Sequence, residues 1–176
     1  RQKLIYSLRS PEKRREMIQE LGGSAETEGA VERALTWLAK AQSADGRWDV
    51  DGFATVEACG GAGDRTDGDV GVTGLALLAY LGAGYTHNRG DHQETIRKGL
   101  DWLVAGQAPD GDLRQGGQLY VQAMATAALC ESYSLSGDAR LKEPAQRAVQ
   151  FVLAAQNPEA GWRYHPREDS DTSVTG

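Results

Sequence analysis

The sequence predicts an all-α fold of stacked helical hairpins, and three observations lead to this prediction. A ten-residue motif ending in glutamine occurs three times. Amphipathic segments alternate with segments that are apolar on almost every side. Turns rich in Gly, Asp and Asn join them. Internal repeats of this kind bury each hairpin against the next, so we expect a curved solenoid or a ring with inner and outer helices.

The motif contains a basic residue, a small residue, an aromatic, an aliphatic and a glutamine at fixed spacing. Its copies span 33–42, 98–107 and 147–156. Each ends in Gln42, Gln107 or Gln156, and six residues beyond these glutamines stand Trp48, Leu113 and Trp162. Three such matches at fixed spacing indicate repeated units of one structural type.

The outer helices are predicted from apolar stripes within the motif copies. Val31, Leu35 and Leu38 belong to such a stripe in the first copy, with polar residues on the other side. Ile96, Leu100 and Leu103 repeat it in the second copy, and the third copy has Ala145, Ala148, Val149, Val152 and Leu153. Spacings of three and four residues are typical of a helix with one packed side.

The inner helices are predicted over 70–81 and 119–130, which are apolar nearly all round, with Gly and Ala where neighbours approach closely. Helices of this composition belong in a protein interior. The segment 169–176 matches 67–74 at a shift of 102 residues, so it predicts the start of a third inner helix.

This organisation predicts two regions. Residues 1–23 form a charged helical extension, and residues 24–176 form a partial ring truncated at its C-terminal end. Because the third inner helix is interrupted after its first turn, we expect the chain to be a fragment, about half of a ring of roughly six hairpins.

Composition limits the classes of function. The chain has 176 residues, 40% of them hydrophobic, and a formal charge of -6, which argues against a nucleic-acid partner. No apolar run is long enough to span a bilayer. We expect a soluble domain, and the compartment stays open between the cytoplasm and the periphery of a membrane. Cys59 and Cys130 are too few for a disulfide framework.

The motif resembles the QW repeat of squalene-hopene and oxidosqualene cyclases. Arg33 to Trp48, with Gly46, matches the pattern completely, whereas the second copy has Leu113 in place of tryptophan. The wider sequence looks like bacterial proteins with prenyltransferase and squalene-oxidase repeats. The resemblance covers about 31–176 and implies an α/α toroid in which the glutamine amides tie helix ends together. It assigns the glutamines and tryptophans to stability.

Candidate site residues precede the inner helices. Counting from Trp48, Leu113 and Trp162 gives three pairs of residues at equivalent positions in the repeats. They are Asp67 and Asp69, Tyr120 and Gln122, and Asp169 and Asp171. In a ring of hairpins, we expect these pairs to lie at the same end. The first and second pairs are candidate ligand contacts, with Tyr120 as a cavity wall.

The third pair is the candidate proton donor. Cyclases of the resembled family carry an Asp-x-Asp-Asp motif before an inner helix, and alignment sets it against Glu168-Asp169-Ser170-Asp171, with Ser170 in place of the central acid. Helix N-termini favour ionised carboxylates, so Asp69 and Asp171 fit helix capping better than proton donation.

Metal and cofactor sites have no support in the sequence. No two Asp residues are adjacent, so the magnesium motif of ionising terpene synthases is missing, and we expect no cofactor and no metal. The function implied by the resemblance is an isoprenoid-binding domain with an apolar central cavity, and any activity would be that of a cyclase-like isomerase. The alternatives are a non-catalytic scaffold and a carbohydrate-active toroid. The expected partners are an apolar small molecule, the remainder of the toroid and a membrane surface.

Overall fold

The structure, a computed structural model, describes residues 11–53 and 67–175. Over this part of the chain the regular secondary structure is helical, apart from an isolated bridge between Thr86 and Arg89. The described helices are α2 (Pro11–Glu20), α3 (Ala25–Ala41), α4 (Asp69–Gly82), α5 (Gln93–Ala105), α6 (Leu119–Ser136), α7 (Ala139–Ala154) and α8 (Thr172–Thr175). The prediction of an all-α fold is confirmed.

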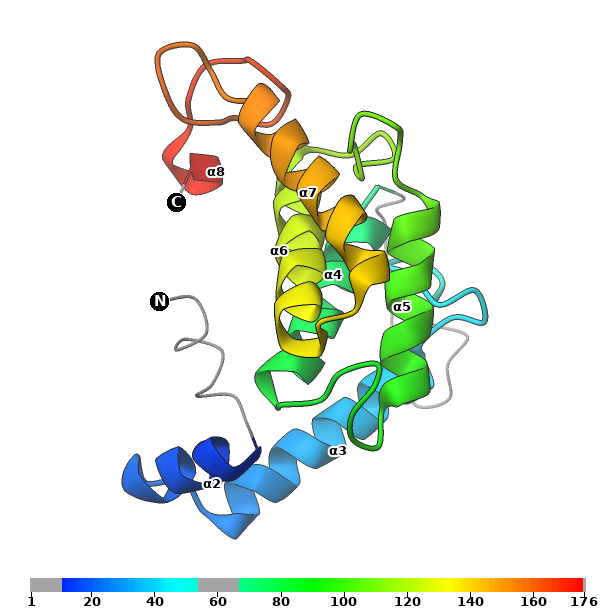
Figure 1. The fold of residues 1–176 in the computed structure, drawn as a ribbon, viewed down its shortest axis with the longest axis vertical. Helices are drawn as coiled ribbons and strands as arrows, with labels where there is room; N and C mark the ends of the chain where they lie inside the picture. Colours follow the sequence, from blue (N-terminus) through cyan, green and yellow to red (C-terminus); the bar gives the residue numbers. More distant parts are fainter. Residues whose placement is uncertain (1–10, 54–66, 176) are drawn as a thin grey trace.

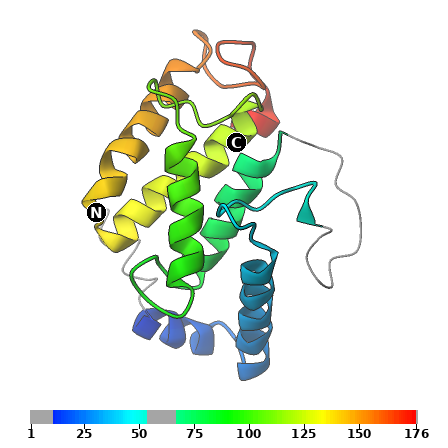
Figure 2. The ribbon, with the colours of Figure 1, turned by 90° about the vertical axis from the view of Figure 1, so that its right-hand side faces the viewer.

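The helices form the two layers that the sequence predicts (Figure 1). Helix α4 packs mainly on α6, and α6 packs on α7. Seen from the side of α5, the inner helices α4 and α6 lie behind it, and α7 lies beside it (Figure 2). The arrangement is a partial α/α toroid.

The inner helices approach closely because α4 carries glycine where it meets α6. A Cβ atom on Gly74 would lie 2.8 Å from the backbone of Met124, and one on Gly71 would lie 2.9 Å from Val121. The buried core extends from here to the outer helices, whose Leu35, Leu100 and Ala148 belong to the same cluster. Small residues on one helix therefore receive larger side chains from the next.

Local signals define the helix ends. Ser24 caps α3 in a reciprocal capping box with Thr27, and Asp138 accepts a hydrogen bond from the backbone N–H of Arg140 at the start of α7. Gly137, with a φ of 67°, ends α6. The charged segment after Pro11 is helical, as predicted. Its separation from the ring at residue 23 stays a prediction.

Three turns of identical construction follow the outer helices, at 43–47, 108–112 and 157–161. In each turn, the first residue's N–H donates to the fifth residue's carbonyl, and the fourth residue's N–H donates to the first residue's carbonyl. The next backbone N–H donates to a side chain on an inner helix. The three donor–acceptor pairs are Trp48 to Thr73, Leu113 to Gln122, and Trp162 to Thr175.

These bonds correct the register of the second inner helix. Counting loop residues placed Gln122 at the position equivalent to Asp69. In the structure, however, Gln122 accepts the hydrogen bond from the turn N–H that Thr73 accepts in the first repeat. The shift is four residues, and it puts Gln118 at the position of Asp69 and Tyr120 at that of Gly71. The loop count was wrong because it assumed loops of equal length before α6 and α8, whereas the loop before α8 is four residues longer.

The glutamines connect successive outer helices. Gln42 donates to the carbonyls of Gly46 and Thr95, the latter in α5. Gln107 donates to the carbonyl of Pro144 in α7 and accepts hydrogen bonds from Arg147. Gln156 makes no comparable side-chain bond within the described residues.

None of the described helices has the length and apolar character needed to cross a bilayer. Cys130 is a free thiol on α6. Cys59 and the glycine-rich stretch that follows it lie outside the described residues.

Candidate functional site

The N-terminal ends of α4 and α6 border a half-open cavity of about 150 Å³ lined by Asp67, Gly68, Gln118, Tyr120 and Val121. The sequence predicted that Asp67 and Tyr120 would lie at the same end of the ring, and they share this cavity. Tyr120 lies here as the second residue of α6, where its side chain is half-buried.

Tyr120 belongs to a hydrogen-bonded chain that reaches α8. The Tyr120 hydroxyl donates a hydrogen bond to Oγ of Ser173 at 2.5 Å. The Ser173 hydroxyl in turn donates to Oδ1 of Asp171 at 2.5 Å. The ring of Tyr164 lies 6.1 Å from that of Tyr120 between centroids. The structure therefore links Asp171 to Tyr120 through the hydroxyl of Ser173.

Asp171 is held in its ionised form. The hydrogen bond from the Ser173 hydroxyl, together with one from the Ser173 backbone N–H, lowers the pKa of Asp171 below its ordinary value. Its backbone and side-chain bonds to residues 173–175 make it the N-terminal cap of the short helix α8, as predicted. A general acid must instead hold its proton until the reaction.

The other candidates lie in different surroundings. Asp169 is exposed and accepts the backbone N–H of Ser170. Gln122 is completely buried, and its amide bonds to the backbone of Leu113 and Gly111 and to the hydroxyl of Thr126. All the hydrogen bonds of the Gln122 amide therefore go to protein, and its role in ligand binding stays a prediction.

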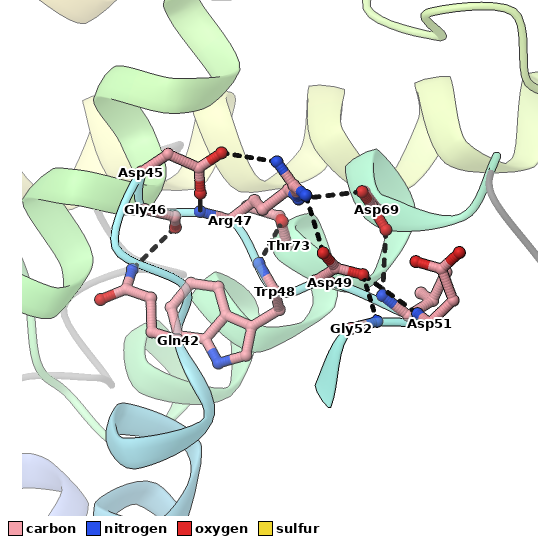
Figure 3. Close-up of polar contacts among 11 residues, drawn as sticks. Gln42, Asp45, Gly46, Arg47, Trp48, Asp49, Asp51, Gly52, Asp69 and Thr73 are labelled. Atoms are coloured by element: carbon pink, nitrogen blue, oxygen red, sulfur yellow. Dashed lines mark hydrogen bonds and ion pairs between the residues drawn. The ribbon is translucent and has the colours of Figure 1, made fainter. Parts of the chain in front are cut away.

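Asp69 does not cap α4, which corrects the expectation from the sequence. It is the first residue of the helix, and Gly68 stands at the cap position without a side-chain bond. Oδ1 of Asp69 instead accepts the N–H of Val50 at 3.0 Å, and Oδ2 lies 3.1 Å from Nε of Arg47. The carboxylate thus fastens the loop after Trp48 to the inner helix (Figure 3).

Sequence reasoning missed the rest of this cluster. Asp49, Asp51 and Asp69 each place a carboxylate oxygen within 4.8 Å of the others. The available signal was the pair of Asp-x-Asp stretches at 49–51 and 67–69, of which only the second was considered. Figure 3 shows Arg47 between Asp45, Asp49 and Asp69.

Arg47 sets the electrostatics of this cluster. Its hydrogen bond to Asp49, at 2.7 Å, lowers the pKa of that carboxyl, while the hydrogen bond that Asp51 shares with Asp49 raises the pKa of Asp51. The cluster therefore holds one guanidinium among its carboxylates, and the ion pairs of Arg47 together with hydrogen bonds from backbone N–H groups account for its geometry.

With this geometry in place, the comparison with known families identifies the fold's lineage. The model of the squalene-hopene cyclase C-terminal domain family matches residues 16–122, more than half of the chain. The chain belongs to this family. It is a cyclase-like repeat domain, and the match includes α3 to α5 and ends within the first turn of α6. No curated protein and no solved structure gives a significant match.

Proposed function

We propose that this cyclase-like domain binds an isoprenoid or similarly apolar ligand against its inner helices, without donating a proton from Asp171. The observation that carries the proposal is the apolar side of α4, where Val72 is 38% exposed and Leu75 is 49% exposed. Residues on the solvent-facing side of a helix are usually polar, so an apolar stripe there fits a surface that meets an apolar molecule.

The neighbouring helix supports the same placement. Met124 of α6 stands one repeat beyond Leu75, at the shift of 49 residues that the turn hydrogen bonds define. It is half-buried beside the α4 interface. Leucine and methionine at equivalent positions of successive inner helices offer a continuous apolar wall, and Tyr120 adds an aromatic surface near one end.

The state of the carboxylates favours binding over cyclisation. Protonating an alkene requires a carboxylic acid, and the hydrogen bonds from Ser173 keep Asp171 in the ionised form instead. Asp169 is exposed to solvent, away from the buried core. The assignment to an isomerase therefore receives no support from these two residues.

The binding test compares one residue on each layer. The full chain is titrated with a fluorescent farnesyl analogue, and Leu75→Gln is compared with Leu153→Gln on the outer helix α7, where the leucine is 61% exposed. Losing burial of one leucine should weaken binding on the order of tenfold for Leu75→Gln only. Equal weakening of farnesyl binding by both variants, or a lack of saturable binding, would favour the non-catalytic scaffold instead.

A second assay addresses catalysis. The chain is incubated with squalene and shorter polyprenyl substrates, and products from the parent and Asp171→Asn are compared. We expect no cyclised product from either. Turnover that depends on Asp171 would refute binding without chemistry, and release of sugars from an oligosaccharide control would favour the carbohydrate-active alternative.

A further inference from the structure

The three turns that follow the outer helices differ at one decisive position. Their hydrogen bonds superimpose Gly46, Gly111 and Ala160 as the fourth residue of each turn. All three residues have positive φ angles, 104°, 96° and 109° respectively. Glycine adopts this conformation freely, whereas alanine is strained in it.

The two glycines are required by the next outer helix. A Cβ atom on Gly46 would lie 2.4 Å from the carbonyl oxygen of Lys98 in α5, and one on Gly111 would lie 2.1 Å from that of Arg147 in α7. Real Cβ atoms do not approach carbonyl oxygens so closely. Each outer helix therefore docks on the preceding turn only because that turn has no side chain at this point.

Ala160 presents a side chain at the same point of the third turn. We propose that this turn is closed to an outer helix docked as α5 and α7 are docked, whether the helix belongs to this chain or to a second copy. The regular packing of an outer helix on each preceding turn therefore does not continue beyond α7. Any further outer helix has to lie farther from the third turn or cross it at a different angle.

The contacts around the third turn agree with a cap. The loop after Trp162 folds onto this turn. The N–H of Arg167 donates to the carbonyl of Ala155 at 2.8 Å, and the amide of Asn157 donates to the carbonyl of Glu168 at 2.6 Å.

This closure concerns the outer layer alone, because the inner side of the third repeat is arranged as in the others. Thr175 accepts the N–H of Trp162 just as Thr73 accepts that of Trp48. An inner helix can therefore follow the regular path at α8 while the outer layer departs from it.

Thiol accessibility tests the closure directly. In the full chain with Cys59→Ser and Cys130→Ser, Ala160→Cys is labelled with a maleimide at high protein concentration. Ser134→Cys, at an exposed position, and Ala148→Cys, at a completely buried one, are the controls. We expect Ala160→Cys to react within about tenfold of the exposed control. A rate close to that of the buried control would overturn the proposal.

A stability comparison gives an independent reading. Ala160→Ser should leave the urea midpoint of the full chain unchanged, because Ala160 is exposed among the described residues. Gly111→Ser should lower the midpoint markedly, because its side chain meets α7. A loss at position 160 as large as the loss at position 111 would show that an outer helix covers the third turn, and the proposal would then be wrong.

Discussion

At the scale of single residues, glycine decides how closely the repeats can approach. Gly111 and Gly116 lie in neighbouring turns with the same φ of 96°, but only Gly111 lies against another backbone. The space beyond Gly116 is empty to 4 Å. The two positions therefore separate the cost of backbone conformation from the cost of steric overlap.

This contrast gives the first prediction. Gly116→Ala should cost about 1 kcal/mol, the conformational cost of alanine at positive φ. Gly111→Ala should cost at least about 3 kcal/mol, because α7 must also move away from the turn. Urea denaturation followed by circular dichroism measures both. Similar losses would mean that α7 yields easily at this contact.

Among single residues, the sequence located the candidate positions better than their roles. Asp67 and Tyr120 were expected at one end of the ring, and they line one cavity. The bonds of Asp69 to Val50 and Arg47 were not foreseen, because a carboxylate before a helix is read first as a cap. Loop backbone and ion-pair geometry are decided by packing that no local pattern encodes.

At the scale of elements, α7 depends on its first residues. Its cap, Asp138, is bonded to Arg140 and lies 2.9 Å from Nε2 of His87. The hydrogen bonds from Arg140, followed by that from His87, lower the pKa of Asp138 below its ordinary value near 4. This carboxylate consequently links the loop before α5 to the start of α7.

The second prediction concerns pH. Because the folded-state pKa of Asp138 is depressed, its stabilisation is complete above the ordinary pKa and is lost as the pH falls through the folded value. Asp138→Asn keeps a capping side chain but removes the charge. It should be less stable than the parent at pH 7 and converge with it as the pH falls below about 4.

Urea midpoints at several pH values between neutral and strongly acidic conditions would check this convergence. Glu159→Gln, a change at an exposed residue of the third turn, serves as the control. Its urea midpoint should stay close to that of the parent at every pH. A deficit of Asp138→Asn that stays constant with pH would assign its cause to packing instead.

The layers themselves could be predicted from the sequence because helical periodicity distinguishes striped helices from fully apolar ones. Helix α5 buries Ile96, Leu100 and Leu103 on one stripe, and α4 buries residues on most of its sides. The register between inner helices could not be predicted. It depends on loop lengths, and the four additional residues before α8 leave no periodic trace in the sequence.

At the scale of the whole molecule, glutamine amides hold consecutive repeats together. Gln107 joins the end of α5 to Pro144 and Arg147 in α7, whereas Gln156 has no such partner among the described residues. Gln107 is half-buried, so removing its amide leaves the Pro144 carbonyl and the Arg147 guanidinium short of bonds.

The third prediction follows from this difference. Gln107→Ala should destabilise the chain by about 1 to 3 kcal/mol, because it removes bonds to a carbonyl and to a charged group. Gln156→Ala should cost less than about 0.5 kcal/mol. Thermal unfolding by calorimetry measures both values. Equal costs would indicate that Gln156 has acquired a partner in solution.

The placement of the indoles gives the repeats separate optical signatures. Trp48 is buried and donates a hydrogen bond from Nε1 to the carbonyl of Leu38. In the third repeat, Trp162 donates the equivalent hydrogen bond to the carbonyl of Val152. Trp37, in α3, is 47% exposed. The equivalent position of the middle repeat holds Leu113, and the indole of that repeat is Trp102 in α5. Loss of blue-shifted emission from Trp48 or Trp162, each observed in a background lacking the others, would reveal which end of the array melts first.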